Sequence, residues 1–122
     1  MNASDAPWPR DIAYDPQRKS LRVTFESGET FDLPAEYLRV ESPSAAVQGH
    51  GPSQKKIVSG RRHVRIETVE PVGHYAIRIV FDDKHDTGIY SWSYLRELGD
   101  TFAERWGAYQ AALLYRGLSR DP

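Results

Sequence analysis

Apolar and polar residues alternate over two early segments of the chain. Between residues 21 and 25 every second side chain is apolar, and the alternation resumes over 31–33 after Ser27-Gly28. A period of two residues is typical of a half-buried strand, and a tight Gly-containing turn between two such runs predicts a β-hairpin. Residues 11–14 form a further candidate strand, which the turn signal Asp15-Pro16 would end.

The residues after this hairpin predict one short helix and three more strands. Pro34 suits the first position of a helix, because proline has no N–H to lose there, and Tyr37 and Leu38 would face inward. The strands are expected where apolar residues recur on one face, namely Val64, Ile66 and Thr68; Tyr75, Ile77, Ile79 and Phe81; and the short run 88–90.

The last third of the chain has a helical pattern. Ser91 or Ser93 can cap a helix that Gly99 would end as its C′ residue. Asp100 or Thr101 would cap a second helix, whose apolar stripe recurs at three- and four-residue steps: Phe102, Trp106, Tyr109, Ala112 and Leu113. We therefore expect an α+β fold, in which a small antiparallel β-sheet of five to six short strands carries the C-terminal helices on one face.

The length of 122 residues is that of one domain. We expect a flexible lead-in over 1–9, a single domain over 10–117 and a tail over 118–122. The N-terminal residues contain no apolar leader, and no stretch approaches the roughly 20 apolar residues of a membrane span. These features predict a cytoplasmic protein with no membrane contact.

Charge and cysteine content exclude several functional classes. The 16 Lys and Arg nearly balance the 17 Asp and Glu, which disfavours nucleic-acid binding, because phosphate backbones select a basic excess. With no cysteine in the chain, disulfides, zinc-thiolate sites and cysteine nucleophiles are excluded.

The irregular segment between residues 43 and 60 holds a candidate ligand or partner loop, made of Gln48, Gly49, His50, Gly51, Lys55 and Lys56. Glycines around a histidine let backbone N–H groups converge on an anion. The alternative is a tight turn that needs positive φ.

The four histidines are the softest metal ligands of the chain. Together with Asp82, Asp83 and Asp86 they could hold iron or zinc, and His50 with His85 is the pair we single out. The alternative is that the histidines are surface or hydrogen-bonded residues and that the aspartates are solvated turn residues.

Two further groups have a functional and a structural interpretation. Five cations could bind a phosphate or an acidic partner, or could form a solvated basic face: Lys55, Lys56, Arg61, Arg62 and Arg65. Four aromatic residues could form a stacking platform, but their helical spacing beside leucines favours the core: Trp92, Tyr94, Trp106 and Tyr109.

Two segments together resemble the γ-butyrobetaine hydroxylase-like N-terminal domain: LRVESPSAAVQGHG from Leu38 and GHYAIRIVFDDKHDTGIYSWSYL from Gly73. The resemblance extends from about Pro9 to Gly99. The resemblance implies that, in the oxygenases of that family, a Leu-Arg pair precedes a Cys-x-Cys-x-x-Cys motif, and that the three cysteines and a later histidine bind zinc. Here Leu38-Arg39 is present, the histidine corresponds to His85, and the cysteine positions are Ser42, Ser44 and Val47. Serine is a poor zinc ligand, so the zinc site does not carry over.

The resemblance implies no catalysis, because the iron and 2-oxoglutarate of those enzymes sit in a separate C-terminal domain that this sequence lacks. We therefore expect a non-catalytic accessory or protein-interaction domain without a cofactor, which binds a partner protein or itself as a homodimer. One alternative is an iron- or zinc-binding accessory domain for oxygenase or iron–sulfur proteins, with His50 and His85 as ligands. Another is a small enzyme with His50 or His85 as general base, for which the sequence supplies no second catalytic group.

Overall fold

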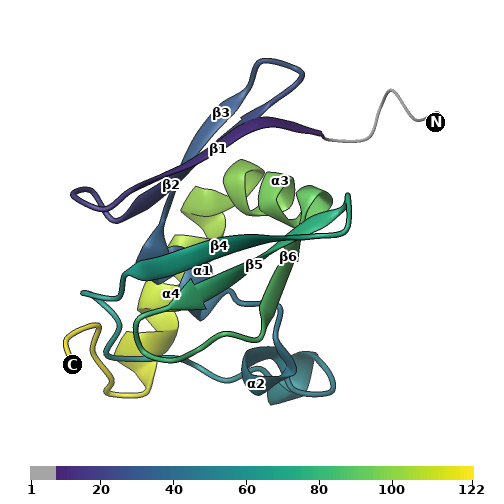
Figure 1. Cartoon of the computed structure of the whole chain (residues 1–122). Helices are drawn as coiled ribbons and strands as arrows, with labels where there is room; N and C mark the ends of the chain where they lie inside the picture. The colour runs from purple at the N-terminus through teal and green to yellow at the C-terminus, as the bar shows by residue number, and fades with distance from the viewer. Residues whose placement is uncertain (1–7) are drawn as a thin grey trace.

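The computed structural model describes residues 8–122 (Figure 1). Most of the expected lead-in therefore lies outside the described residues. Along the chain the elements are β1 (Pro9–Asp15), β2 (Ser20–Phe25), β3 (Thr30–Pro34), α1 (Ala35–Val40), α2 (Ala45–Gln48), the 3-10 turn η2 (Pro52–Gln54), β4 (Ile66–Val72), β5 (Ala76–Phe81), β6 (Gly88–Ser91), α3 (Trp92–Asp100) and α4 (Phe102–Tyr115).

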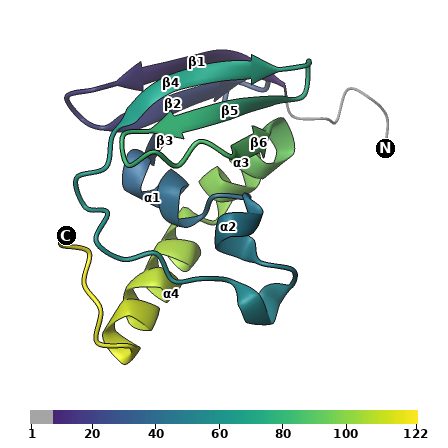
Figure 2. The ribbon, with the colours of Figure 1, turned by 60° about the horizontal axis from the view of Figure 1, so that its bottom comes forward.

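The strands form two antiparallel sheets of three, in the orders β1-β2-β3 and β4-β5-β6. In Figure 2 the strands lie on one side and α1, α3 and α4 on the other. The predicted α+β class, the antiparallel strands and the C-terminal helices are confirmed. The strands are divided between two sheets instead of forming one.

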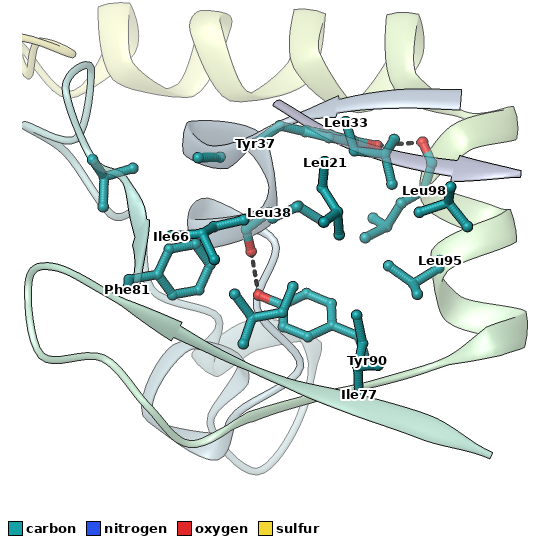
Figure 3. Close-up of a cluster of buried hydrophobic side chains, with 14 of the residues drawn as sticks. Leu21, Leu33, Tyr37, Leu38, Ile66, Ile77, Phe81, Tyr90, Leu95 and Leu98 are labelled. Atoms are coloured by element: carbon teal, nitrogen blue, oxygen red, sulfur yellow. Dashed lines mark hydrogen bonds between the residues drawn. The ribbon is translucent and has the colours of Figure 1, made fainter. Parts of the chain in front are cut away.

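One hydrophobic core joins both sheets to the helices (Figure 3). The alternating residues Leu21, Val23 and Phe25 are buried, as the period of two predicts. Residues from every layer meet them there: Leu33, Tyr37, Leu38, Ile77, Ile79, Phe81, Tyr90, Leu95 and Leu98. Of the predicted aromatic platform, Tyr109 is buried, and Trp92, Tyr94 and Trp106 pack against the core, so the structural interpretation of these aromatics is correct.

Two expectations for the second sheet were wrong at single positions. The pairing of β4 with β5 shifts register between Ile66 and Thr68, so Thr68 is exposed and Val69 packs on the core. A bulge of this kind inserts one residue and reverses the alternation beyond it. Tyr75 precedes β5 and is 60% exposed instead of sharing the inner face of that strand.

Gly99 lies inside α3 and is not the C′ residue that its position suggested. A Cβ atom at this position would be 2.6 Å from the ring of Phe31, so the close approach of α3 to β3 requires glycine. The start of α3 is as predicted, because the Ser91 hydroxyl accepts a hydrogen bond from the N–H of Tyr94. Thr101 precedes α4, but its side chain does not cap that helix.

The C-terminal residues pack against the rest of the domain instead of extending away from it. The N–H groups of Gly60 and Arg62 donate to the carbonyls of Ser119 and Arg120. The guanidinium of Arg120 also makes two hydrogen bonds to the carboxylate of Glu36, 2.7 and 2.9 Å long. Within residues 8–122, no helix has both the length and the apolarity that a membrane span requires.

Candidate functional site

Two side-chain hydrogen bonds connect the segment after α1 to the turn between β5 and β6. The Ser42 hydroxyl oxygen is 2.8 Å from Nε2 of His85, and the hydroxyls of Ser44 and Thr87 are 2.6 Å apart. Both serines are buried. The structure thus brings together Ser42 and His85, two of the four positions that the family resemblance pairs with zinc ligands.

Side chains satisfy the carbonyl groups at the end of α1, which have no donor within so short a helix. The hydroxyls of Tyr90 and Tyr94 donate to the carbonyls of Leu38 and Glu41, and the Gln48 amide donates to the carbonyl of Ser42. Burial raises the pKa of Tyr90, and burial together with Glu41 raises the pKa of Tyr94 to about 12. Both hydroxyls therefore keep their protons and remain donors at neutral pH.

Asp83 holds two guanidinium groups beside His85. Its Oδ2 atom accepts from Nε of Arg39 at 2.7 Å and from Nε of Arg61 at 2.6 Å. The prediction that Asp83 is a solvated turn residue is therefore wrong. Burial alone would raise the pKa of Asp83, but the backbone N–H of His85 and the guanidinium of Arg39 together hold that pKa below its usual value.

Burial lowers the pKa of His85, and the positive charge of Arg39 lowers it further. The imidazole is therefore neutral at pH 7, and its Nε2 either accepts from the Ser42 hydroxyl or donates to it, according to the tautomer. Arg39 is itself buried, and its Nη1 makes no hydrogen bond within the described part of the chain.

The structure gives His50 and His85 different surroundings. His50 is exposed after α2, and its backbone N–H donates to the side chain of Gln54. His85 is half-buried and contacts Ser42. Across residues 8–122, no three His, Asp or Glu side chains lie in a group that could hold a metal ion. The iron or zinc site remains a prediction.

The loop from Gln48 to Gly51 has the geometry of a tight turn. Gly49 has φ of +67°, and a Cβ atom there would be 2.6 Å from Cβ of Gln54. The side-chain amide of Gln48 donates to the carbonyl of Ser42. Gln48 and Gly49 therefore both hold the backbone of this loop in place. The ligand-binding role of this loop remains a prediction.

A second feature is a groove of about 210 Å³ between α4 and the segment 55–58. Val40, Ile57, Ala108 and Ala112 contribute apolar surface, and Lys55, Lys56 and Arg105 contribute three cations. The carboxylate of Glu41, which is 5% exposed, accepts from Lys55 at 2.9 Å and from Arg105 at 3.0 Å. We call the site that these residues line the α4 groove.

The sequence profile of the gamma-butyrobetaine hydroxylase-like, N-terminal family matches residues 12–96. The chain belongs to that family. It is similar to two proteins whose solution structures were determined by NMR. The first is 43% identical with a TM-score of 0.82, over 95% of this chain and 91% of that one. The second is 39% identical with a TM-score of 0.84, over 100% and 91%.

A crystal structure of a protein of unknown function from Acidithiobacillus ferrooxidans, of the DUF971 family, is also similar to this gamma-butyrobetaine hydroxylase-like domain. It is 40% identical with a TM-score of 0.64, over 75% of this chain and 91% of that one. No curated protein matches the chain. The comparisons thus establish the family and leave its biochemical function open.

Sequence patterns did not indicate two features of this gamma-butyrobetaine hydroxylase-like domain. Glu41 and Arg105 meet across 64 positions, and no local pattern pairs residues so far apart. The exposed side of α4 is apolar, with Leu114 83% and Tyr115 92% exposed. The small residues Ala103, Gly107 and Ala111 carried that signal, because they occupy positions where a surface helix usually has charges.

Removing metal is expected to leave this domain folded, because apolar packing and the Ser42–His85 contact stabilise the fold without an ion. A strong chelator should lower the Tm of untagged protein by less than about 4 °C. A metal held at a hundred times its Kd would contribute about 2.7 kcal/mol, which corresponds to a fall of roughly 8 °C or more.

Elemental analysis of the same untagged protein is the companion measurement, and His85→Ala is the matched variant. Stoichiometric iron or zinc that His85→Ala removes, with a large fall in Tm that added metal reverses, would contradict this expectation and establish the metal hypothesis.

Proposed function

We propose that this chain is a non-catalytic interaction domain that binds a partner protein through the exposed side of α4. This surface, the α4 face, consists of Ala103, Gly107, Ala108, Ala111, Leu114 and Tyr115, with Glu104 and Gln110 as its polar members. A helix that covers a domain with one side normally has charged residues on the other. Figure 2 shows α4 on the side of the molecule away from the strands, and all eight of these residues are exposed.

The opposite side of α4 already accounts for the stability of the helix. Tyr109 and Leu113 are buried with Val40, and Trp106 packs against the same cluster. The exposed leucine and tyrosine are therefore not needed for folding. Burying each of them against a partner would contribute about 1.5–3 kcal/mol, and aromatic anchors are typical of the centre of an interface.

The small residues of the α4 face determine what can dock there. Ala103, Gly107 and Ala111 follow each other at four-residue steps, so their side chains lie along one line of the helix. Side chains at the contact set the distance between packed helices, which is about 8 Å at its shortest. The α4 face therefore suits a helix of the partner that lies close against this line.

The geometry at Ser42 is the strongest argument for the competing view that this is an enzyme. A serine hydroxyl in contact with an imidazole is the arrangement of an activated nucleophile. However, Ser42 is 0% exposed, so a substrate could reach its hydroxyl only if the segment 42–44 opened. A nucleophile that is fully buried supports a structural contact, and this burial favours the non-catalytic proposal.

The test is a double variant, Leu114→Lys with Tyr115→Ser, compared with Tyr75→Ser as a matched loss of an exposed tyrosine outside the α4 face. Partners captured on the immobilised wild-type protein are identified, purified and titrated, and light scattering measures self-association. Since two anchors are removed, we expect binding to weaken by at least about 100-fold at unchanged Tm. Tyr75→Ser should bind as the wild type does.

Two results would contradict the proposal. One is a purified partner that binds the double variant and the wild type equally well. The other is a wild-type protein that stays monomeric and retains no partner. A homodimer that the double variant dissociates would support the proposal, with a second copy as the partner.

A further inference from the structure

The α4 groove lies beside the α4 face and shares only Ala108 with it. Figure 2 shows the chain between η2 and β4 passing alongside α4. We propose that this groove binds a short acidic peptide segment by taking up one large apolar side chain. The inference goes beyond the proposed function, because it concerns a second site with a ligand of its own.

The volume of the groove determines the size of the occupant. Pockets for drug-sized ligands and cofactors measure about 300–1,000 Å³, whereas this groove measures about 210 Å³. An apolar cavity of about 150 Å³ is large enough for benzene. The groove therefore fits one apolar side chain and is too small for a nucleotide or a flavin.

The walls of the groove are already in place without a ligand. The N–H of Lys56 donates to the carbonyl of Val47 at 2.7 Å, and the hydroxyl of Tyr109 donates to the carbonyl of Val58 at 2.6 Å. Between these two bonds, Ile57 packs on the cluster of Val40 and Tyr109. A preformed groove lowers the entropic cost of binding.

The charges around the groove select the sign of the ligand. Lys55 and Arg105 share the carboxylate of Glu41, and Arg105 also pairs with Glu97. Lys56 is exposed and has no ion pair within the described part of the chain. The groove thus has three cations and two carboxylates around it, and one of these carboxylates is almost fully buried. The surplus positive charge favours carboxylates next to the apolar anchor.

The probe is a blocked heptapeptide with phenylalanine at its centre and Asp or Glu at every other position. Amide NMR spectra of the full chain are recorded during the titration. We expect saturable shifts confined to residues 55–58 and 105–112, with a Kd of about 0.1–1 mM. A peptide with lysines in place of the acids, and one with alanine in place of phenylalanine, should each bind about tenfold more weakly.

Two substitutions at exposed positions test the site without disturbing the core. Ala108→Phe fills the groove, and Lys56→Glu reverses the surplus charge, so each should weaken binding of the acidic peptide at least about tenfold. Lys84→Glu, the same charge reversal in the turn between β5 and β6, should leave binding unchanged.

The groove proposal is overturned if the acidic peptide causes no saturable shifts at the highest soluble concentration, if its shifts lie outside the groove, or if the lysine peptide binds equally well. None of these three results bears on the α4 face, because the Leu114→Lys, Tyr115→Ser protein should still bind the peptide. Loss of peptide binding in that protein would show that the two surfaces are one site and would overturn the proposal of a separate groove.

Discussion

Asp83→Ala is expected to lower the free energy of unfolding by about 3 kcal/mol. Removing one partner of a buried ion pair leaves the other charge unpaired, which typically costs about 3–5 kcal/mol. The Arg39 side chain is only 10% exposed, so its charge would be left largely buried when its partner is lost. The low end of the range applies because the Arg61 side chain is 34% exposed and can turn outward.

The measurement is urea denaturation at pH 7, with two matched variants. Asp83→Asn keeps an oxygen that can accept from the N–H of His85 but loses the charge, so it should fall between wild type and Asp83→Ala. Asp86→Ala removes an exposed carboxylate in the same turn, whose contact with Arg78 is 3.8 Å long. It should cost less than about 1 kcal/mol. Equal effects of Asp83→Ala and Asp86→Ala would contradict the prediction.

The same pair makes stability depend on pH. The pKa of Asp83 is lower in the folded state than in the unfolded chain, where aspartate has a pKa of about 3.9. The carboxylate therefore stabilises the fold above that pH, and this contribution is lost as pH falls through the folded-state pKa. The difference between wild type and Asp83→Asn should be constant from about pH 6 to 7 and shrink below about pH 4.

The parts of the fold that the sequence predicted are those with a local period. The alternation of Leu21, Val23 and Phe25 predicted the strand and its buried face. The pair Ser27-Gly28 predicted the hairpin turn, where Gly28 has φ of +95°. The bulge after Ile66 could not be predicted, because an inserted residue changes the pairing with β5 without changing the composition of β4. Gly99 was misassigned because a glycine required by packing and one required by positive φ look the same in a sequence.

The candidate site was predicted in part, and the reason is similar. The family resemblance placed Ser42 and His85 together, and they are in contact. It also grouped Ser44 with them, but the hydroxyl of Ser44 contacts Thr87. The pairing of Arg39 with Asp83 spans 44 positions. Such pairs follow from the way the two sheets meet the helices, which no single segment encodes.

Taken together, these contacts explain how the scaffold closes without cysteines. The end of α1 is held by hydroxyl groups on its carbonyls, by the serine–imidazole contact and by the carboxylate of Asp83 between two guanidinium groups. These links act on the same short segment, where hydrogen bonds in a network reinforce one another. The core residue beneath them, Tyr90, should therefore be one of the most sensitive positions of the chain.

Tyr90→Ala is expected to lower the free energy of unfolding by about 3–5 kcal/mol, the usual cost of removing a large buried ring. Tyr90 is 0% exposed, and its hydroxyl donates to the carbonyl of Leu38. Tyr90→Phe keeps the ring and leaves that carbonyl without a donor, which should cost about 1–2 kcal/mol. Tyr75→Ala, at a tyrosine that is 60% exposed, is the matched control and should stay within about 0.5 kcal/mol of wild type.

Urea denaturation of the four proteins separates packing from hydrogen bonding at this position. If Tyr90→Phe is as destabilising as Tyr90→Ala, the hydroxyl bond to the end of α1 holds the two layers together, and the ring contributes little. If Tyr90→Phe has no effect, the Leu38 carbonyl finds another donor, and the account of how α1 ends is wrong. The expected order, with alanine far below phenylalanine and phenylalanine clearly below wild type, requires both the ring and its hydroxyl.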